Sequence, residues 1–308
     1  MWPVLLPEHL LHDLYGSKAL LRLASKGVIP RREILRLYRP RSESVEQVVW
    51  TADDVPLLDE ARAVLGPRLG RRTEDAIRTY GHIVIDEAQD LSPMELRMIR
   101  RRSLNGSLTI VGDIAQATGP WAQHDWNLVV DDLQQKHDPR FAELTVGYRL
   151  PQPTMDVANR VQQAAAPHLK PPVAVRVEGF EPKFVAADTP ASLGSVVAAL
   201  SPRELEAVGA GNLAIIAPDS LLATVSVALE AAGIDHGRVY EGALESQVSV
   251  VPPRLVKGLE LDAAIVVEPA AIVAEERNGL QALYVALTRA TRRLHVVHAD
   301  PLPESLHP

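Results

Sequence analysis

Two adjacent acids, Asp86 and Glu87, are the residues of this sequence best suited to chemistry, and they follow the short apolar run Ile83-Val84-Ile85. Hydrolysis of a nucleotide phosphate needs such a pair: one carboxylate is held toward Mg²⁺, and the other orients and activates a water molecule. The same chemistry needs a loop of the form G-x-x-x-x-G-K-[ST] that cradles the phosphates. None of the 18 Gly residues is followed by Lys. The sequence therefore contains one half of a nucleotide site and lacks the other half.

Further polar residues stand at the ends of predicted strands and helices. Gln116 follows the next predicted strand, where a glutamine can reach a terminal phosphate and its attacking water. Arg149 and Arg289 each offer a guanidinium, which suits the charge that spreads over phosphoryl oxygens. Gly258 allows a ligand to approach the backbone closely, and Glu260 can accept hydrogen bonds from a sugar hydroxyl. Taken singly, each is more often a turn residue or a solvated side chain, so the combination carries the argument.

The elements that must position these residues change character near residue 80. Before it, leucines at helical spacing predict helices. After it, short apolar strands alternate with helices, which predicts parallel sheets with helices on both faces. The predicted strands are 83–85, 108–111, 143–146, 183–186, 213–216, 247–251, 264–267 and 294–297, and the predicted helices include 92–102, 154–166 and 221–232. Capping signals predict helix starts at Ser92-Pro93-Met94-Glu95 and at Ser201-Pro202-Arg203-Glu204.

Composition excludes several classes of protein. A hydrophobic content of 46% over 308 residues supports folded domains rather than disorder. The net charge of −7 argues against a protein whose whole surface binds nucleic acid, although a local basic stripe is compatible with this charge. Cysteine is absent, His residues show no metal spacing, and no apolar run reaches transmembrane length. The N-terminus lacks the features of a signal peptide, so we expect a cytoplasmic protein with no membrane partner.

Five motifs occur in a fixed order: the acid pair, Gly-Asp-x-x-Gln, Tyr-Arg, Lys-Gly-Leu-Glu and Thr-Arg-Ala. In this order they resemble the superfamily 1 helicases, the UvrD- and Rep-like group, over about residues 80 to 300. The stretches Asp-Glu-Ala-Gln-Asp-Leu-Ser-Pro-Met from residue 86 and Glu-Leu-Thr-Val-Gly-Tyr-Arg from residue 143 are most similar to actinobacterial HelD. That group comprises helicase-like ATPases that act on RNA polymerase. The stretch from Trp2 to Leu65 is similar to the same group.

The resemblance implies an α/β fold of the RecA-like (P-loop NTPase) kind, with parallel sheets flanked by helices in two domains, the first incomplete. It implies a helical lead-in at 1–80, the C-terminal half of the first domain at 81–147, and the second domain at 148–308. The implied activity is that of an ATP-dependent helicase or ATPase. The implied partners are RNA polymerase, DNA as a further possibility, and a missing N-terminal half of the motor.

The implied cofactors are ATP and Mg²⁺, and the motif residues take roles by position. Asp86 would hold Mg²⁺ through water, and Glu87 would be the catalytic base. Gln116 would couple the terminal phosphate to domain movement. Arg149 and Arg289 would be the two arginine fingers.

Two nucleotide-binding positions and one nucleic-acid position complete the implied site. Gly258 and Glu260 would lie near the nucleotide, with Glu260 on the ribose. Trp121 stands where UvrD-like helicases carry an aromatic that stacks on a DNA base. The residues after it differ from those helicases, and a tryptophan packed in the core is at least as compatible with the sequence.

We expect little or no ATPase activity from these 308 residues alone, because they contain no phosphate-binding loop. Only 108 positions separate Arg149 from Lys257, which favours the HelD type over UvrD-type enzymes with a large extra domain there. Three interpretations stay open. The first is a truncated motor, which would be a gene fragment, an alternative start or half of a split protein. The second is a non-catalytic module that binds RNA polymerase, and the third is a UvrD-type DNA helicase fragment.

Overall fold

The computed structural model describes residues 5–67, 77–133, 138–238 and 246–307. Its chain divides into two compact units. The first unit comprises residues 1–86, 92–111 and 129–137, and the second comprises residues 87–91, 112–128 and 138–308. The loops that follow the first two strands therefore belong with the second unit.

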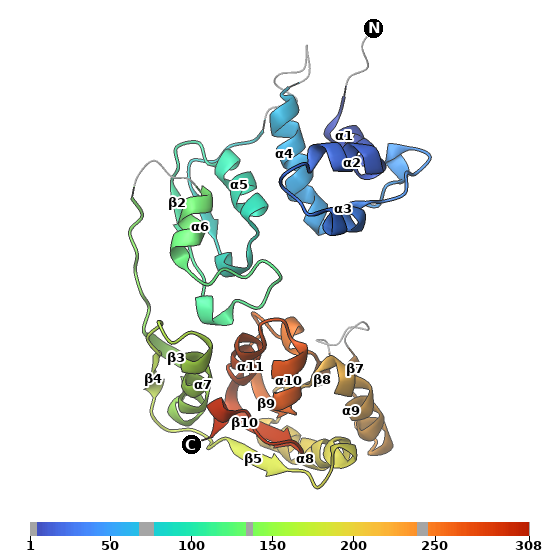
Figure 1. The fold of residues 1–308 in the computed structure, drawn as a ribbon. Coiled ribbons are helices and arrows are strands. Elements are labelled where there is room, and N and C mark those ends of the chain that lie inside the picture. The colour runs from blue at the N-terminus through green and yellow to red at the C-terminus, as the bar shows by residue number, and fades with distance from the viewer. Residues whose placement is uncertain (1–4, 68–76, 134–137, 239–245, 308) are drawn as a thin grey trace. The chain divides into compact units, whose positions relative to one another are not determined.

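Four helices open the first unit, as the leucine spacing predicts. They are α1 Pro7–Tyr15, α2 Lys18–Ala24, α3 Arg31–Leu37 and α4 Val55–Leu65 (Figure 1). Single 3₁₀ turns occur at Val45–Gln47 and Ala52–Asp54. Each of the first three helices buries one apolar side chain, namely Leu11, Leu21 and Ile34. Helices this short depend on such contacts, because isolated helices below about 12 residues are marginal in water.

A buried carboxylate, Asp54, ties the helical segment together. Asp54 accepts two hydrogen bonds from the Arg39 guanidinium at 2.7 and 2.9 Å, and one from the backbone N–H of Thr51 at 2.9 Å. The Arg39 contact lowers the pKa of Asp54 to about 2, so the pair stays ionised at neutral pH. The same guanidinium lies 4.8 Å from the centre of the Tyr15 ring. The end of α1, the segment after α3 and the start of α4 are therefore joined through one ion pair.

The rest of the first unit contains a two-stranded parallel sheet. Its strands are β1 Ile83–Ile85 and β2 Leu108–Ile110, with Val84 opposite Thr109. Helix α5, Pro93–Arg102, connects them, and α6, Trp126–Leu133, follows. The capping box predicted at the start of α5 is confirmed: Ser92 Oγ accepts the backbone N–H of Glu95, and Glu95 Oε2 accepts that of Ser92.

The second unit is built on a six-stranded sheet in which all strand pairs are parallel. In spatial order its strands are β5 Lys183–Ala186, β10 Ala290–His298, β9 Leu261–Val267, β6 Leu213–Ile216, β8 Val248–Val251 and β7 Gly237–Arg238. Its helices are α7 Gln152–Ala165, α8 Leu193–Val208, α9 Asp219–Ala231, α10 Pro269–Glu275 and α11 Gly279–Leu287.

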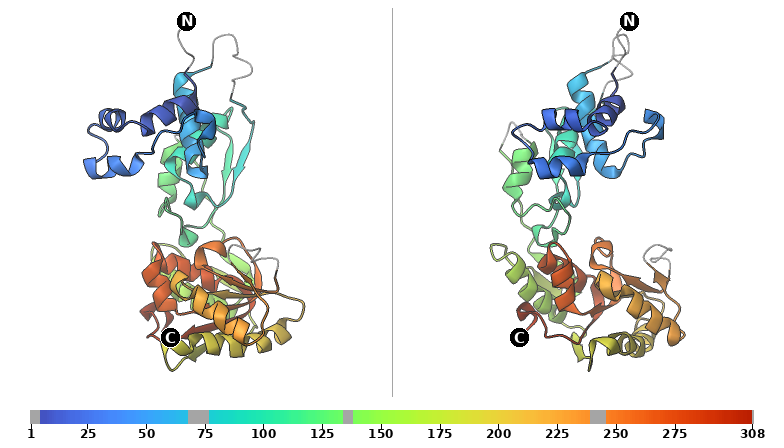
Figure 2. Two further views of the ribbon diagram at one scale, coloured as in Figure 1. Left: turned by 90° about the vertical axis from the view of Figure 1, so that its right-hand side faces the viewer. Right: turned by 45° about the vertical axis from the view of Figure 1, so that its right-hand side comes forward.

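Helices cover both faces of this sheet (Figures 1 and 2). Leu213 and Ile215 of β6 pack with α8 and α9, whereas Ala214 and Ile216 pack with α7 and α11. Successive side chains of a strand point to opposite faces, so both sets are buried. That is why the strands read as continuous apolar runs in the sequence.

A second small parallel sheet precedes α7. It pairs β3 Val146–Pro151 with β4 Val173–Arg176, with Val146 opposite Val173. A Cβ at Gly147 would lie 2.9 Å from Met155 Cε, so a side chain there would require the end of Met155 to shift.

The predicted fold class is confirmed: the molecule is α/β, with parallel sheets flanked by helices. The strand predicted at 143–146 starts three residues too early, because pairing begins where Val146 meets Val173. Strand β4 was not predicted from the sequence. Among the described residues, no helix combines the length and apolar character needed to cross a membrane.

The helix start predicted at Ser201-Pro202-Arg203-Glu204 is wrong. Helix α8 runs through it, with Pro202 inside the helix. Ser201 Oγ donates to the Val197 carbonyl instead of capping a helix, at 2.8 Å. Glu204 is buried and bonds to Arg293 on β10. Packing of Leu193, Val197 and Val208 against the sheet continues the helix past a local signal that would otherwise start a new one.

Candidate functional site

The loop after β1 carries the predicted acids in a strained backbone conformation. Asp86 ends the first segment of the first unit, and Glu87 begins the second unit. Glu87 has φ of +52°, in the left-handed region that non-glycine residues seldom adopt. A 3₁₀ turn, Ala88–Asp90, follows at once. Both carboxylates are exposed, so a ligand could reach the strand end.

Gln89 holds this loop against the next one. Its Nε2 donates to Glu87 Oε2 at 2.6 Å, and its Oε1 accepts the backbone N–H of Asp113 at 3.0 Å. The side chain is fully buried. A Cβ at Gly112 would lie 2.2 Å from Gln89 Oε1, so glycine is required there. The amide therefore orients the Glu87 carboxylate, a role that sequence reasoning did not assign.

Gln116 lies at the end of a second 3₁₀ turn, Ile114–Gln116, which follows β2. Asp113 Oδ2 accepts a hydrogen bond from Gln116 Nε2 at 2.8 Å. With the amide turned in this way, Gln116 Oε1 accepts a hydrogen bond from Arg289 Nη2 at 2.9 Å. Two predicted site residues, 173 positions apart, thus lie in direct contact within the second unit.

Arg289 is a buried cation, with 3% of its surface exposed, between the end of α11 and the start of β10. Its guanidinium donates to the carbonyls of Val285 and Leu259 at 3.0 and 3.3 Å, and to Thr288 Oγ1 at 3.0 Å. Burial, and then the charge of Arg149, lower the pKa of Arg289 below its usual range, while the nearby Glu87 and Asp113 act in the opposite direction. Arginine nevertheless stays protonated in proteins, so a fixed positive charge is held here mainly by neutral acceptors.

Lys257 adds a second, largely buried cation, with 14% of its side chain exposed. Its Nζ donates to the Gln116 carbonyl at 2.7 Å, lies 3.4 Å from Glu87 Oε2 and bonds to Asp90 Oδ2. It therefore connects the loop after β1 with the loop after β2. Its place in Lys-Gly-Leu-Glu was the signal in the sequence, but no role followed from it.

Arg149 and Glu260 form an ion pair of 2.6 Å in which both side chains are about half exposed. Arg149 lies on β3 and Glu260 just before β9. Gly258, nearby in the chain, has φ of +76° and open space where a side chain would point. Gly258 and Glu260 lie between Lys257 and the start of β9, and the ion pair with Arg149 joins this segment to β3.

Trp121 is 56% exposed, which does not fit a tryptophan packed in the core. The loop before it is fixed by the Gly119 N–H, which donates to Asp90 Oδ1 at 3.0 Å. The indole is thus available for stacking, on a segment tied to the Lys257–Asp90 contact.

The donor set fits Mg²⁺ with a phosphate substrate. Proteins hold Mg²⁺ through one or two carboxylates and complete its shell with phosphate oxygens and water. Within the second unit Glu87 supplies such a carboxylate, and Lys257, Arg149 and Arg289 supply positive charge, whereas Asp86 is the last residue of the preceding segment of the first unit. In the part of the chain that the structure describes, no group of three or more His, Cys, Asp or Glu could hold a metal by itself.

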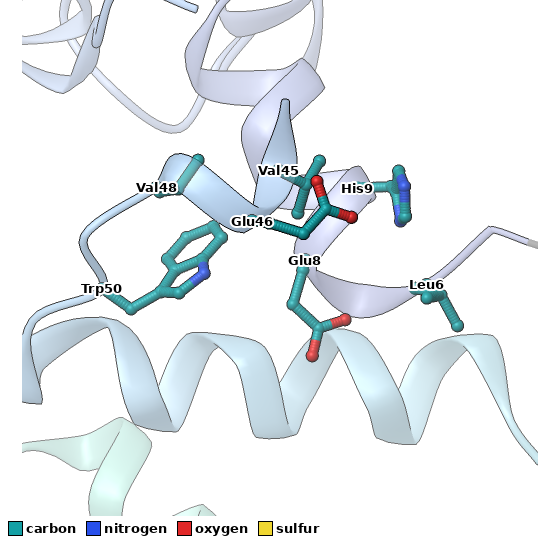
Figure 3. Close-up of a pocket in the computed structure, with 7 residues that line it drawn as sticks. All are labelled: Leu6, Glu8, His9, Val45, Glu46, Val48 and Trp50. Carbon is teal, nitrogen blue, oxygen red and sulfur yellow. The ribbon is translucent and has the colours of Figure 1, made fainter. Parts of the chain in front are cut away.

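Two cavities of the first unit lie apart from every predicted site residue. One, of about 330 Å³, is lined by Leu6, Glu8, His9, Val45, Glu46, Val48 and Trp50 (Figure 3). The other, of about 320 Å³, is lined by Leu5, Leu6, Pro7, Glu8, Arg62, Leu65 and Gly66. Neither contributes to the cluster around Gln116 and Arg289.

Together, these elements define a parallel α/β protein with carboxylates, amides and buried cations gathered at loop ends. No protein-family model and no curated protein matches the chain. Among solved structures, it is similar to the C-terminal domain of a possible DNA helicase from Lactobacillus plantarum WCFS1, with 27% identity and a TM-score of 0.39 over 52% of this chain and 92% of that one. It is also similar to the Arterivirus nonstructural protein 10 helicase, with 17% identity and a TM-score of 0.39 over 75% of this chain and 41% of that one.

Proposed function

We propose that this chain is the C-terminal part of an ATP-dependent, superfamily 1 helicase-like motor of the HelD type. The motor would couple ATP hydrolysis to the remodelling of RNA polymerase or nucleic acid. The hydrogen bond between Arg289 and Gln116 carries the proposal. It joins a glutamine at one strand end to a buried guanidinium, in the cluster that also contains Glu87 and Lys257. A purely structural cluster would not need exposed carboxylates beside two buried cations.

In the proposed reaction, Glu87 accepts the proton of the attacking water, and Gln89 keeps its carboxylate oriented. Arg149 and Arg289 stabilise the charge that develops on the transferred phosphoryl oxygens, and arginines in such positions change rates by about 10³–10⁵. Asp86 would hold Mg²⁺, which would supply positive charge beside the phosphates. Gln116 would exchange its contact with Arg289 for one with the phosphate or the water.

In this proposal, the loop before β9 binds the ribose and the adjoining part of the nucleotide. Gly258 leaves room for the nucleotide beside the backbone, and Glu260 accepts hydrogen bonds from the ribose hydroxyls. Because Glu260 bonds to Arg149 at 2.6 Å, a nucleotide that binds Glu260 also releases Arg149. One binding event would then free both the ribose acceptor and one arginine finger.

We expect the 308-residue protein to bind Mg-ATP weakly and to show no turnover above background. The reason is that nothing in its sequence supplies the amides and the lysine of a phosphate loop. Equilibrium binding of a fluorescent ATP analogue and a steady-state phosphate-release assay measure the two properties. Turnover that Glu87→Gln abolishes would contradict the need for the loop. Absence of any nucleotide binding would contradict the site itself.

We also expect the protein to be retained on immobilised RNA polymerase in the absence of ATP, because the HelD-type interpretation assigns it this partner. The measurement is retention of wild-type protein on beads with and without polymerase. Glu87→Gln is the matched variant: equal retention would assign binding to surfaces other than the catalytic loop. Retention no greater than on bare beads would leave nucleic acid as the target of the proposed motor.

A further inference from the structure

The lead-in of the first unit contains a strongly basic segment in an acidic protein. Residues 16–42 hold eight of the 32 Lys and Arg residues and one of the 39 Asp and Glu residues, a local charge of +7. The whole chain carries −7, so the remaining residues carry −14. Six of the eight cations are arginines. This asymmetry, rather than the net charge, bears on what the segment can bind.

The segment folds as a helical hairpin formed by α2 and α3, which we call the basic hairpin (Figure 1). Lys18, at the start of α2, lies 4.6 Å from the centre of the Tyr38 ring, just after α3, so the two arms run in opposite directions. Leu21 and Ile34 are its buried residues on the two helices. The cations therefore occupy outward-facing positions of a small, fixed element.

Four of these eight cations have neither an ion pair nor a ring contact in the described part of the chain. Arg39 and Arg41 pair with Asp54 and Asp13. In contrast, no ion pair joins Arg22, Lys26, Arg31 or Arg36 to any described residue, and all four are exposed. Arg32 lies 3.7 Å from Glu33 and is 86% exposed.

Some of the cations are also regularly spaced. Lys18 and Arg22 of α2 are four residues apart, as are Arg32 and Arg36 of α3, and Lys26 lies in the turn after α2. Residues four apart on a helix lie on one side of it, about 6 Å apart along the axis. Like charges at this spacing repel one another, so the bare hairpin is electrostatically unfavourable and a polyanion would relieve it.

We propose that the basic hairpin is a binding surface for the phosphate backbone of nucleic acid, without sequence preference. An arginine guanidinium can donate two parallel hydrogen bonds to the oxygens of one phosphate. A surface with many cations and a single acid attracts a polymer in which every unit carries a negative charge, as the nucleic-acid backbone does. A protein partner would favour charges of both signs. Exposed apolar side chains on α2 and α3, such as Leu23 and Leu35, make an anionic membrane the alternative that the experiment below tests.

This inference is independent of the nucleotide site proposed above, because it needs no ATP and no residue of that site. Each phosphate neutralised changes the slope of log K against log salt by about 0.9 on duplex DNA and 0.7 on single strands. Six cations, Lys18, Arg22, Lys26, Arg31, Arg32 and Arg36, would give a slope of about −5 on duplex. Removing four of them should reduce its magnitude by about 3 to 4.

The experiment measures fluorescence anisotropy of short labelled duplex and single-stranded DNA between about 50 and 200 mM salt, without nucleotide. The test variant combines Arg22→Glu, Lys26→Glu, Arg32→Glu and Arg36→Glu. The control combines Arg140→Glu, Lys170→Glu, Arg203→Glu and Arg277→Glu, which are exposed residues of the second unit. Both variants replace three Arg and one Lys, so they have the same net charge and the same composition change.

We expect the hairpin variant to lose binding and salt dependence, and the control to keep the wild-type slope. Trp121→Ala removes no charge, so loss of base stacking would lower the affinity and leave the slope at its wild-type value. Equal losses in both variants would attribute binding to net charge and overturn the proposal. So would wild-type protein that binds no DNA, or that sediments with anionic vesicles while ignoring DNA. Circular dichroism of each variant confirms that the helices are retained.

Discussion

The variant Glu204→Ala will lower the free energy of unfolding of the second unit by about 3–5 kcal/mol. Glu204 has 1% of its surface exposed, and it accepts two hydrogen bonds from Arg293, at 2.6 and 3.0 Å. Truncation leaves the Arg293 guanidinium, which is itself mostly buried, without its counter-charge. The cost of an unpaired buried charge exceeds the net contribution of the intact pair, so the effect is large.

The surroundings of Glu204 offer no substitute partner. His295 Nε2 lies 3.7 Å from Glu204 Oε1, which also accepts from Arg293, but burial lowers the pKa of His295 below its usual range, so the ring is neutral near pH 7. The Phe180 ring stacks under Arg293 with the guanidinium carbon 3.9 Å from its centre. An aromatic face attracts a cation but cannot replace a bidentate carboxylate.

Urea unfolding followed by circular dichroism measures this effect. Because the chain has two units, we expect two transitions and a shift in one of them. Glu206→Ala on the same helix is the control, since Glu206 is exposed and should change stability by less than about 0.5 kcal/mol. If Glu204→Ala and Glu206→Ala unfold alike, the Glu204–Arg293 pair does not hold α8 on the sheet.

Glu204 also shows where local sequence signals stop being informative. Ser92-Pro93-Met94-Glu95 and Ser201-Pro202-Arg203-Glu204 carry the same capping pattern, yet only the first starts a helix. In the first, Glu95 bonds back to Ser92. In the second, Glu204 bonds to Arg293, 89 positions away, and Ser201 bonds within the helix. Which partner an acid meets depends on tertiary packing, and the four-residue pattern does not contain that information.

The strands were predictable because a strand that is buried on both faces appears in the sequence as a continuous run of apolar residues, ended by a polar one. The position of the acid pair after β1 followed from this pattern. The contacts among Gln89, Gln116, Lys257 and Arg289 were not predictable, because each joins loops that come together only when the strands align. Motif order indicated that Gln116 and Arg289 belong to one site, but not that Gln89 orients Glu87 or that Lys257 bridges two loops.

The contact between Gln116 and Arg289 is the strongest test of the proposed site. We expect a double-mutant cycle of Gln116→Ala and Arg289→Ala to give a coupling free energy of about 1.5–3 kcal/mol without nucleotide. The bond is 2.9 Å long, its donor is charged, and the guanidinium is buried. The matched cycle uses Gln116→Ala with Arg292→Ala. Arg292 is half exposed and lies 3.5 Å from Asp262, so its coupling to Gln116 should be near zero.

Addition of Mg-ATP or a non-hydrolysable analogue turns this cycle into a test of mechanism. If Arg289 transfers its donors to phosphate oxygens, the coupling to Gln116 falls, because the two residues no longer satisfy each other. Arg289→Lys keeps the positive charge but loses the paired donors of the guanidinium. We therefore expect it to be more stable than Arg289→Ala but to show no change in coupling when nucleotide is added.

A coupling that nucleotide leaves unchanged would mean that Arg289 serves only to hold the loop after β2. A coupling absent from the start would mean that the contact itself does not persist in solution. The cycle therefore separates an arginine that stabilises the fold from one that also acts on phosphate.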